Sequence, residues 1–212
     1  MTRKRKEYII AMLFILPSLA GITVFYIVPY IICFVKSLYV GNTFVGIQNY
    51  IQLFQNNTFL LALKNTAVFT VAAIPLLMVI SFLIALFLNS FKKISSFFRS
   101  ALLIPVVVPV ASLICVWQVI FDDYGAVNGL LNSLGFNTVE FFNSEFSMVM
   151  IIFIYVWKYC GFCVIVFTAG LANVSQTLYE SARLDGASSF QIVTRITIPM
   201  ITPTTFFVFL ME

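Results

Sequence analysis

The chain contains few residues that could carry out catalysis. It has 212 residues and no histidine, so the commonest general base and the Ser-His-Asp arrangement are both excluded. It also has no G-x-x-x-x-G-K-[ST] sequence, so it does not itself bind ATP through a P-loop. The one adjacent acidic pair, Asp122-Asp123, precedes Tyr124-Gly125, which is typical of a solvated turn at a helix end. The sequence therefore predicts no catalytic residue, no metal site and no cofactor.

The four cysteines favour packing over redox or metal chemistry. Cys160-Gly-Phe-Cys163 matches the C-x-x-C pattern, but that pattern needs a strand-to-helix turn or a folded knuckle around it. Both cysteines lie instead in the middle of an apolar stretch, and Cys33 and Cys115 lie in two others. Because a free cysteine behaves as a small hydrophobic residue, we interpret these positions as packing residues.

The composition predicts a membrane protein with helical spans. The chain is 61% hydrophobic and 9% charged, whereas a soluble domain is about a quarter charged. A membrane span needs about 20 mostly apolar residues. The uncharged run that begins after Arg195 stops at Glu212 and falls short of that length. The predicted spans are about 8–35, 65–91, 100–121 and 147–171, with an incomplete fifth at 196–212.

The first apolar run is interpreted as an uncleaved helix. The basic N-terminus and a small-x-small site at Ser18-Leu19-Ala20 also fit a secretory signal peptide. However, the run continues to Val35, which is longer than the roughly 7 to 15 residues of a signal core.

The distribution of lysine and arginine predicts the orientation. Positive charge collects in cytoplasmic loops, and most of it lies near the N-terminus and in two later loops. We therefore expect a cytoplasmic N-terminus, with 36–64 and 121–146 outside and 91–100 and 171–197 inside.

Lys158 is the one charge well inside a predicted span. Such residues usually face a cavity or a partner, which makes Lys158 and its neighbour Trp157 candidates for the solute pathway. The alternative is that Lys158 extends to the outer interface beside Trp157 and Tyr159, which are residue types of the interfacial aromatic belt.

The loop at about 172–197 predicts two short helices that meet at a glycine. Thr177-Leu-Tyr-Glu180 and Ser188-Ser-Phe-Gln191 are both capping-box patterns, and Gly186 is placed to end the first helix in the left-handed conformation. An apolar face is expected on the second helix from Phe190, Val193 and Ile196. Such an element could push on a cytoplasmic partner, or it could be an ordinary connector in which Glu180 only caps its helix.

The same loop carries a family resemblance. Tyr-Glu180-Ser-Ala-Arg-Leu-Asp-Gly186-Ala-Ser, followed by Ile-Thr-Ile-Pro199 and Pro203, resembles the EAA signature of binding-protein-dependent ABC importer permeases, in the carbohydrate branch with the maltose and glycerol-phosphate systems. Phe44–Tyr50 and Gly125–Gly135 resemble the outer-loop signatures of that branch. There are two departures: Ser181 replaces the usual first alanine, and the chain stops at Glu212, before the last core helices of the family.

The resemblance implies an all-α, polytopic helix bundle in the bacterial inner membrane, with 1–212 as one permease domain whose last helices are missing or incomplete. It also implies surrounding lipid, a second permease subunit, a pair of cytoplasmic ABC ATPase subunits, an extracellular solute-binding protein and no nucleic acid. The residues that the resemblance assigns to ATPase coupling are Glu180, Ser181, Ala182, Asp185 and Gly186. The alternatives are a permease for another solute such as an amino acid or an anion, a non-ABC channel or assembly protein, and a membrane-embedded enzyme.

Overall fold

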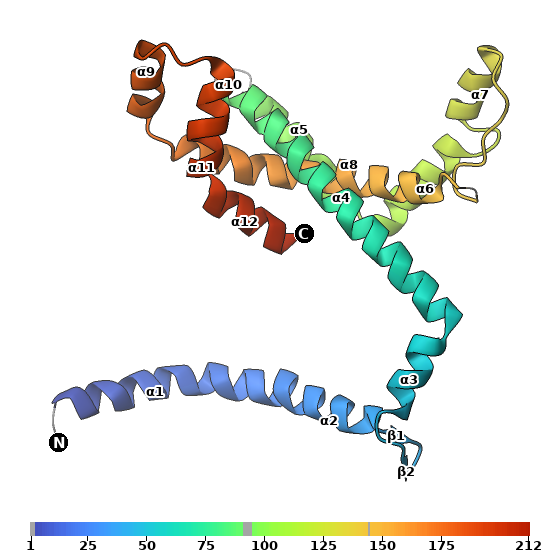
Figure 1. Cartoon of the computed structure of the whole chain (residues 1–212), viewed down its shortest axis with the longest axis vertical. Helices are drawn as coiled ribbons and strands as arrows, with labels where there is room; N and C mark the ends of the chain where they lie inside the picture. The colour runs from blue at the N-terminus through green and yellow to red at the C-terminus, as the bar shows by residue number, and fades with distance from the viewer. Residues whose placement is uncertain (1–2, 91–94, 144) are drawn as a thin grey trace. The chain divides into compact units, whose positions relative to one another are not determined.

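The computed structural model describes residues 3–90, 95–143 and 145–212, and within these ranges the chain is almost entirely helical, as predicted (Figure 1). It divides into two compact units, Met1–Asn65 and Thr66–Glu212. Lys92 and Lys93, on which part of the predicted orientation depends, lie outside the described residues.

The first predicted span is one continuous helix in three pieces. α1 (Arg3–Ile22) runs into a π-helical turn, η1 (Thr23–Ile27), and then into α2 (Val28–Ser37). The wide turn comes just before Pro29, because proline has no N–H to donate and its ring crowds the carbonyl one turn earlier. The N–H of Val28 accordingly bonds to Thr23 O, five residues back. Lys6–Ser37 is long and apolar enough to cross a membrane.

The predicted outer segment after α2 is folded. β1 (Tyr39–Val40) and β2 (Thr43–Phe44) form a small antiparallel hairpin in which Tyr39 pairs with Phe44. The helix α3 (Gln48–Gln55) follows, and the Asn49 amide donates to Ser37 O at 2.8 Å and to Tyr39 O at 3.2 Å. The Tyr50 hydroxyl lies 2.6 Å from that of Ser37. Asn49 and Tyr50 thus fasten this segment to the end of α2.

The second predicted span is α4 (Asn57–Ser90), which begins at Asn57 rather than at 65. The Asn56 side chain causes the early start, since its oxygen accepts the N–H groups of Thr58 at 2.9 Å and Phe59 at 3.2 Å. Lys64 does not interrupt the helix, because lysine is a good helix former. In the second unit one face of α4 is buried, through Ala73, Leu77, Ser81, Ala85 and Leu88.

The third predicted span, 100–121, is two helices rather than one. α5 (Ser95–Val107) ends before Pro109, and α6 (Val110–Phe121) begins after it. Pro109 is extended, with φ −57° and ψ 136°, and proline disfavours helical geometry in the residue before it. The stretch that satisfies the length and apolarity of a membrane span here is Val110–Ser133, which is α6 together with α7 (Ala126–Ser133).

The predicted fifth stretch is a bent pair of helices. α10 (Ser189–Ile192), the π-helical turn η2 (Val193–Thr197) and α11 (Ile198–Met200) are continuous, and α12 (Thr202–Met211) departs from them at 64°. As with Pro29, the π-helical turn ends two residues before a proline, here Pro199, and the N–H of Ile198 bonds to Val193 O. The two arms together are apolar and long enough for one span.

The core of the second unit forms around α8 (Ser147–Ala172), which coincides with the fourth predicted span. Small residues bring the neighbouring helices close to it, as membrane helix interfaces favour. A Cβ on Gly161 would overlap the backbone carbonyl of Leu102 in α5, and a Cβ on Gly170 would lie 2.6 Å from Thr204 Oγ1 in α12. The Ser81 hydroxyl of α4 donates to Cys160 O at 3.4 Å. Figure 1 shows α6 and α7 toward one end of α8 and α9 (Gln176–Leu184) toward the other.

The cysteines fall into two groups. All four are free, with Cys160 and Cys163 buried in α8 and Cys33 and Cys115 exposed. The packing interpretation therefore describes the first pair, whereas Cys33 and Cys115 are each exposed within the described part of their own unit.

Candidate coupling element and membrane-embedded contacts

The first helix of the predicted two-helix element does not begin with the predicted capping box. α9 starts at Gln176 with Ser175 as its N-cap, so Thr177 already lies inside the helix. The hydroxyls of Ser175 and Thr177 lie 2.7 Å apart and bond to each other. The prediction that Glu180 pairs with Thr177 in a capping box is therefore wrong. Within the part of the chain that the structure describes, the exposed Glu180 carboxylate makes no hydrogen bond or ion pair.

The turn at Gly186 is left-handed, as predicted. Its φ is +79°, and α9 ends in a Schellman motif in which Gly186 N–H bonds to Arg183 O at 3.1 Å and Ala187 N–H bonds to Ala182 O at 2.9 Å. A left-handed residue at this position satisfies two carbonyls that the helix end would otherwise leave without a donor. The motif fixes the direction in which the chain leaves α9.

The second helix begins with the predicted capping box. Ser188 N–H donates to Gln191 Oε1 at 2.8 Å, and Gln191 N–H donates to Ser188 Oγ at 3.3 Å. The Gly186 turn is thus held between two helix termini whose backbone groups are bonded locally. This makes the two-helix element a defined shape rather than a loose connector.

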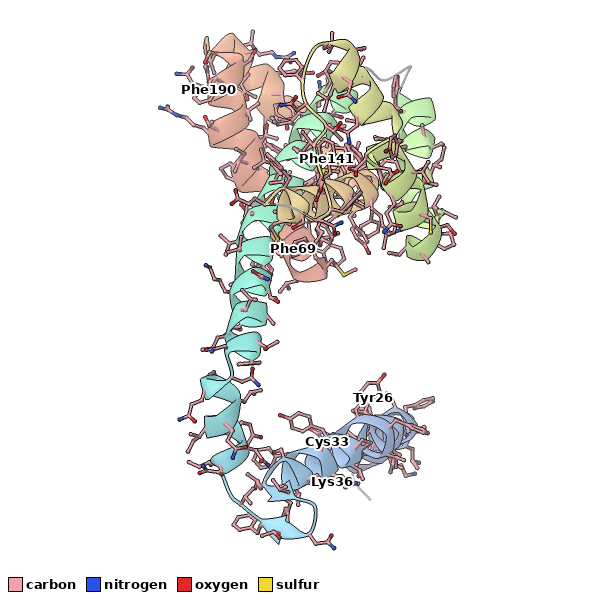
Figure 2. The ribbon with its side chains drawn as sticks, turned by 90° about the vertical axis from the view of Figure 1, so that its right-hand side faces the viewer. Tyr26, Cys33, Lys36, Phe69, Phe141 and Phe190 are labelled. Atoms are coloured by element: carbon pink, nitrogen blue, oxygen red, sulfur yellow. The ribbon has the colours of Figure 1, made fainter. Side chains whose placement is uncertain are left out.

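The predicted apolar face of the second helix is partly wrong. Val193 and Ile196 are half-buried, but Phe190 is 76% exposed (Figure 2), and the buried side chains are Ile192 and Thr197. The reason is the π-helical turn η2, which places residues five apart on the same side and shifts the face relative to a regular helix.

The exposed surface of the two-helix element combines apolar and acidic residues. Leu184, directly before Asp185, is 89% exposed, and Phe190 lies on the other side of the turn. Glu180 and Asp185 are also exposed. A shallow pocket of about 330 Å³ opens beside the turn and is lined by Asp185, Gly186, Ala187, Gln191, Arg195 and Ile196. A surface of this kind suits a protein partner with basic groups around an apolar contact.

A side-chain hydrogen bond connects α9 to the first arm of the bent pair. The Tyr179 hydroxyl lies 3.3 Å from Thr197 Oγ1, and the Thr197 hydroxyl donates to Ile192 O, at the end of α10, at 3.4 Å. The Tyr179 ring packs on the buried core that includes Leu171 and Val174. Tyr179 therefore connects α9 both to the buried core and to the helix that leads to α12.

Lys158 does not face an open cavity in this structure. Its side chain is 7% exposed, and its ammonium donates to Val108 O at 2.9 Å and Pro105 O at 3.1 Å, with Val106 O at 3.5 Å. The ammonium also lies 5.8 Å from the centre of the Tyr159 ring. The acceptors belong to the break between α5 and α6, far from Lys158 in sequence.

Trp157 lies on a different side of α8 and is more accessible. It is 40% exposed, and its ring meets Trp117 of α6 edge to face at 5.3 Å. Trp117 also contacts Phe153 at 5.3 Å, so these aromatic rings connect α6 to α8.

A second polar cluster lies between α8 and α12. Tyr155 OH donates to Glu212 Oε2 at 2.8 Å, and Cys163 Sγ donates to Glu212 Oε1 at 3.2 Å. The Tyr155 ring also packs against Phe69 and Tyr159, with centroids 5.1 Å and 4.9 Å away. A carboxylate among membrane helices is costly and is usually found where a pathway or a partner needs it.

The family follows from residues 77–212, which match the family described as "Binding-protein-dependent transport system inner membrane component". The chain belongs to this family. The matched range contains α8, the Gly186 turn and the bent pair, so it covers the candidate coupling element and the contacts of Lys158 and Glu212.

The curated relatives of this inner membrane component include permease proteins named for sugar transport, and others named for osmoprotective compounds or sn-glycerol-3-phosphate. It is 34% identical to the arabinooligosaccharides transport system permease protein AraP of Bacillus subtilis (strain 168), over 92% of this chain and 65% of that protein. It is 30% identical to the lactose transport system permease protein LacF of Rhizobium radiobacter, over 92% of this chain and 68% of that protein. The chain thus spans about two thirds of the length of these relatives.

Solved structures give the same fold. A bacterial ABC transporter involved in the import of the acidic polysaccharide alginate contains a chain that matches with a TM-score of 0.84 and 27% identity, over 98% of this chain and 72% of that one. The bacterial alginate ABC transporter in complex with an alginate pentasaccharide-bound periplasmic protein matches with a TM-score of 0.81 and 28% identity, over 95% and 69%.

The second segment that the charge pattern predicts to lie outside is also fixed by hydrogen bonds. Gly125 N–H bonds to Asp122 O at 2.8 Å, which confirms the predicted turn at the end of α6. The fully buried Asn128 donates to Asp122 O and Val139 O at 3.0 Å each, and it accepts from Val139 N–H at 2.9 Å. A cavity of about 600 Å³ lies beside it, lined in part by Asp122, Asp123, Glu140 and Phe141.

Several contacts of the candidate residues have no sequence signal. The acceptors of Lys158, the Tyr179–Thr197 bond and the Tyr155–Glu212 bond each join residues on different helices. Pro109 offered a partial signal, because it marks where the third predicted span must lose a backbone hydrogen bond. Which side chain would replace those bonds depends on how α5 packs on α8.

Proposed function

We propose that the chain is the permease subunit of an ATP-driven ABC importer and forms part of the pathway for a sugar or related carbohydrate delivered by an extracellular binding protein. The observation that carries this proposal is the coupling element, in which a Schellman turn presents the unbonded Glu180 carboxylate beside exposed apolar side chains. The sugar assignment is supported by relatives named for arabinooligosaccharides and lactose and by a solved alginate importer.

The coupling residues have separate roles in this proposal. Glu180 and Asp185 are exposed and would meet basic groups on a cytoplasmic ATPase subunit, while Gly186 sets the turn. Ala182 lies on the buried face of α9, and the exposed Ser181 hydroxyl donates to Leu178 O within the same helix at 3.2 Å. Ala182 therefore packs α9 on the rest of the unit, whereas Ser181 bonds within the helix. A second permease subunit would complete the pathway, and lipid would cover the outer surface of the bundle.

Solute contacts are assigned to the exposed ring of Trp157 and to the Tyr155–Glu212 pair, because aromatic faces and hydrogen-bonding groups together suit a carbohydrate. Lys158, whose ammonium is already bonded to backbone carbonyls, shapes the wall of that pathway.

The direct test is uptake of labelled oligosaccharides by cells that express the complete protein with its partner subunits. The proposal expects uptake that needs ATP and the binding protein, and that an excess of unlabelled sugar competes away. Uptake of a labelled amino acid with no response to sugars would overturn the carbohydrate assignment. Uptake that is independent of ATP would overturn the importer assignment.

Glu180 distinguishes a coupling role from a connector. Because its carboxylate bonds to nothing in α9, Glu180→Gln leaves the helix intact and removes only the charge. We expect a loss of about tenfold in uptake, as for a charged contact worth about 1.5 kcal/mol or more. The measurement is uptake at matched membrane levels, with Gln176→Glu as a control for general charge effects on α9. Normal uptake by Glu180→Gln would show that the charge is not used.

The bond between α9 and η2 predicts a smaller effect. Tyr179→Phe keeps the packed ring but removes the hydroxyl that meets Thr197. We expect solute-stimulated ATP hydrolysis to fall about two- to fivefold, since a neutral hydrogen bond contributes about 1 kcal/mol. Basal ATP hydrolysis and ATPase co-purification should stay unchanged. A matching fall in co-purification would instead place the defect in docking.

The predicted orientation can be tested at Ser133, which is exposed at the end of α7. In a chain whose exposed Cys33 and Cys115 are replaced by serine, Ser133→Cys should react with a membrane-impermeant maleimide in intact cells. Reaction only after permeabilisation would show that the charge pattern was misinterpreted.

A further inference from the structure

The break between α5 and α6 removes a backbone donor where α5 packs on α8, a helix long and apolar enough to cross a membrane. In an uninterrupted helix the N–H of residue 109 would bond to the carbonyl of Pro105, but Pro109 has no N–H. Lipid offers no replacement donor, so another protein group must satisfy such a carbonyl. The nearest replacement comes from a different helix, because the ammonium of Lys158 lies 3.1 Å from Pro105 O.

The geometry of Lys158 matches this need. An ammonium has three N–H donors, and the three carbonyls of Pro105, Val106 and Val108 surround it at 2.9 to 3.5 Å. These carbonyls are at the C-terminal end of α5, where the helix dipole is negative, so a positive charge is stabilised there. One turn further along α8, Gly161 brings the backbone of α5 into contact, which sets the distance that Lys158 must reach.

We infer that Lys158 is a positioning residue that caps the end of α5 from α8 and so fixes the angle at which α6 leaves the break. This inference rests on the proposed function and concerns how the pathway wall is held rather than which solute passes. The N–H groups of the ammonium donate to backbone carbonyls. α6 is then oriented so that the ring centroids of Trp117 and Trp157 lie 5.3 Å apart. Transport uses the break, because the solute-facing ring of Trp157 depends on where α6 lies.

A double-variant cycle on the full-length protein in its transporter complex tests this. Lys158→Met removes the donors and keeps the length of the side chain. Pro109→Ala returns the N–H that can bond to Pro105 O. Lys158→Met alone should lower the midpoint of thermal inactivation by about 5 °C or more, and Lys158→Arg, which keeps the donors, should lower it less. In the double variant the midpoint should recover by at least half, because the restored backbone bond replaces the lost cap.

Uptake separates positioning from bulk stability. At matched levels of folded protein, Lys158→Met should lower the maximal uptake rate with the KM for solute unchanged. The double variant should regain stability but not that rate, because the restored bond straightens the break.

If the stability losses of Lys158→Met and Pro109→Ala simply add in the double variant, Lys158 does not cap the end of α5. A raised KM with unchanged stability would show that Lys158 binds solute directly. Recovery of both stability and rate in the double variant would show that the break is not used. If the protein without substitutions shows no uptake, the proposed function is wrong. The capping role of Lys158 is still tested, because the thermal-inactivation measurements do not require transport.

Discussion

Replacing Gly186 with valine should uncouple the protein from the proposed ATPase subunit while leaving it in the membrane. Gly186 has φ +79°, and a β-branched residue there costs about 1 to 3 kcal/mol or straightens the turn. Straightening would break the Schellman bonds of Gly186 and Ala187 and move the surface that carries Leu184 and Phe190. We expect ATPase co-purification and solute-stimulated ATP hydrolysis to fall about tenfold or more, which corresponds to about 1.4 kcal/mol.

The chain offers a matched control for that strain. Gly135 has φ +84° and, like Gly186, has no atom within 4 Å of where a Cβ would lie, but it follows α7 in the predicted outer segment. Gly135→Val should therefore carry the same backbone cost and leave ATPase co-purification normal. Gly186→Asn, which tolerates positive φ, should keep much of the coupling. Equal loss of co-purification in both valine variants would trace the defect to general instability.

Replacing Gly161 with alanine should disrupt the core of the second unit. The added Cβ would overlap the backbone carbonyl of Leu102, and a backbone atom cannot rotate away as a side chain can. α5 and α8 must then separate, which costs about 3 kcal/mol by overpacking and also pulls Lys158 from its carbonyl acceptors. We expect a large fall in the amount of folded protein that detergent extraction recovers, and little uptake by the remainder.

Gly129→Ala is the control for that substitution, because Gly129 also lies in a helix of the second unit and has nothing within 4 Å of its Cβ position. Alanine favours the helix there by about 1 kcal/mol, so the yield should be maintained or rise. A normal yield for Gly161→Ala would mean that α5 and α8 are not in contact at Leu102.

Local signals in the sequence were sufficient to predict some features. The Gly186 turn and the Ser188–Gln191 capping box depend on residues within one helical turn, and both formed as predicted. Long apolar helices also formed where the first and fourth spans are predicted, because long apolar runs with few charges leave few alternatives. The start of α4 was misplaced because Asn56 caps it and Lys64 does not stop it.

Other features depend on competition or on tertiary contacts. Ser175 and Thr177 are two possible caps two residues apart, and the sequence alone favoured the wrong one. The Phe190 face was misplaced because η2 changes the helical period. The acceptors of Lys158 could not be inferred, since they depend on how closely Gly161 lets α5 approach α8.

The most direct test of the account is whether the Gly186 turn touches an ABC ATPase. A photoactivatable cross-linker attached through Leu184→Cys, in a chain with Cys33 and Cys115 replaced by serine, would report the neighbour of a side chain that is 89% exposed beside the turn. In membranes that contain the full transporter, the account predicts an adduct that mass spectrometry identifies as an ABC ATPase subunit, and none from the same linker at Ser133→Cys. An adduct with the ATPase from Ser133→Cys, or adducts from Leu184→Cys with lipid alone, would contradict it.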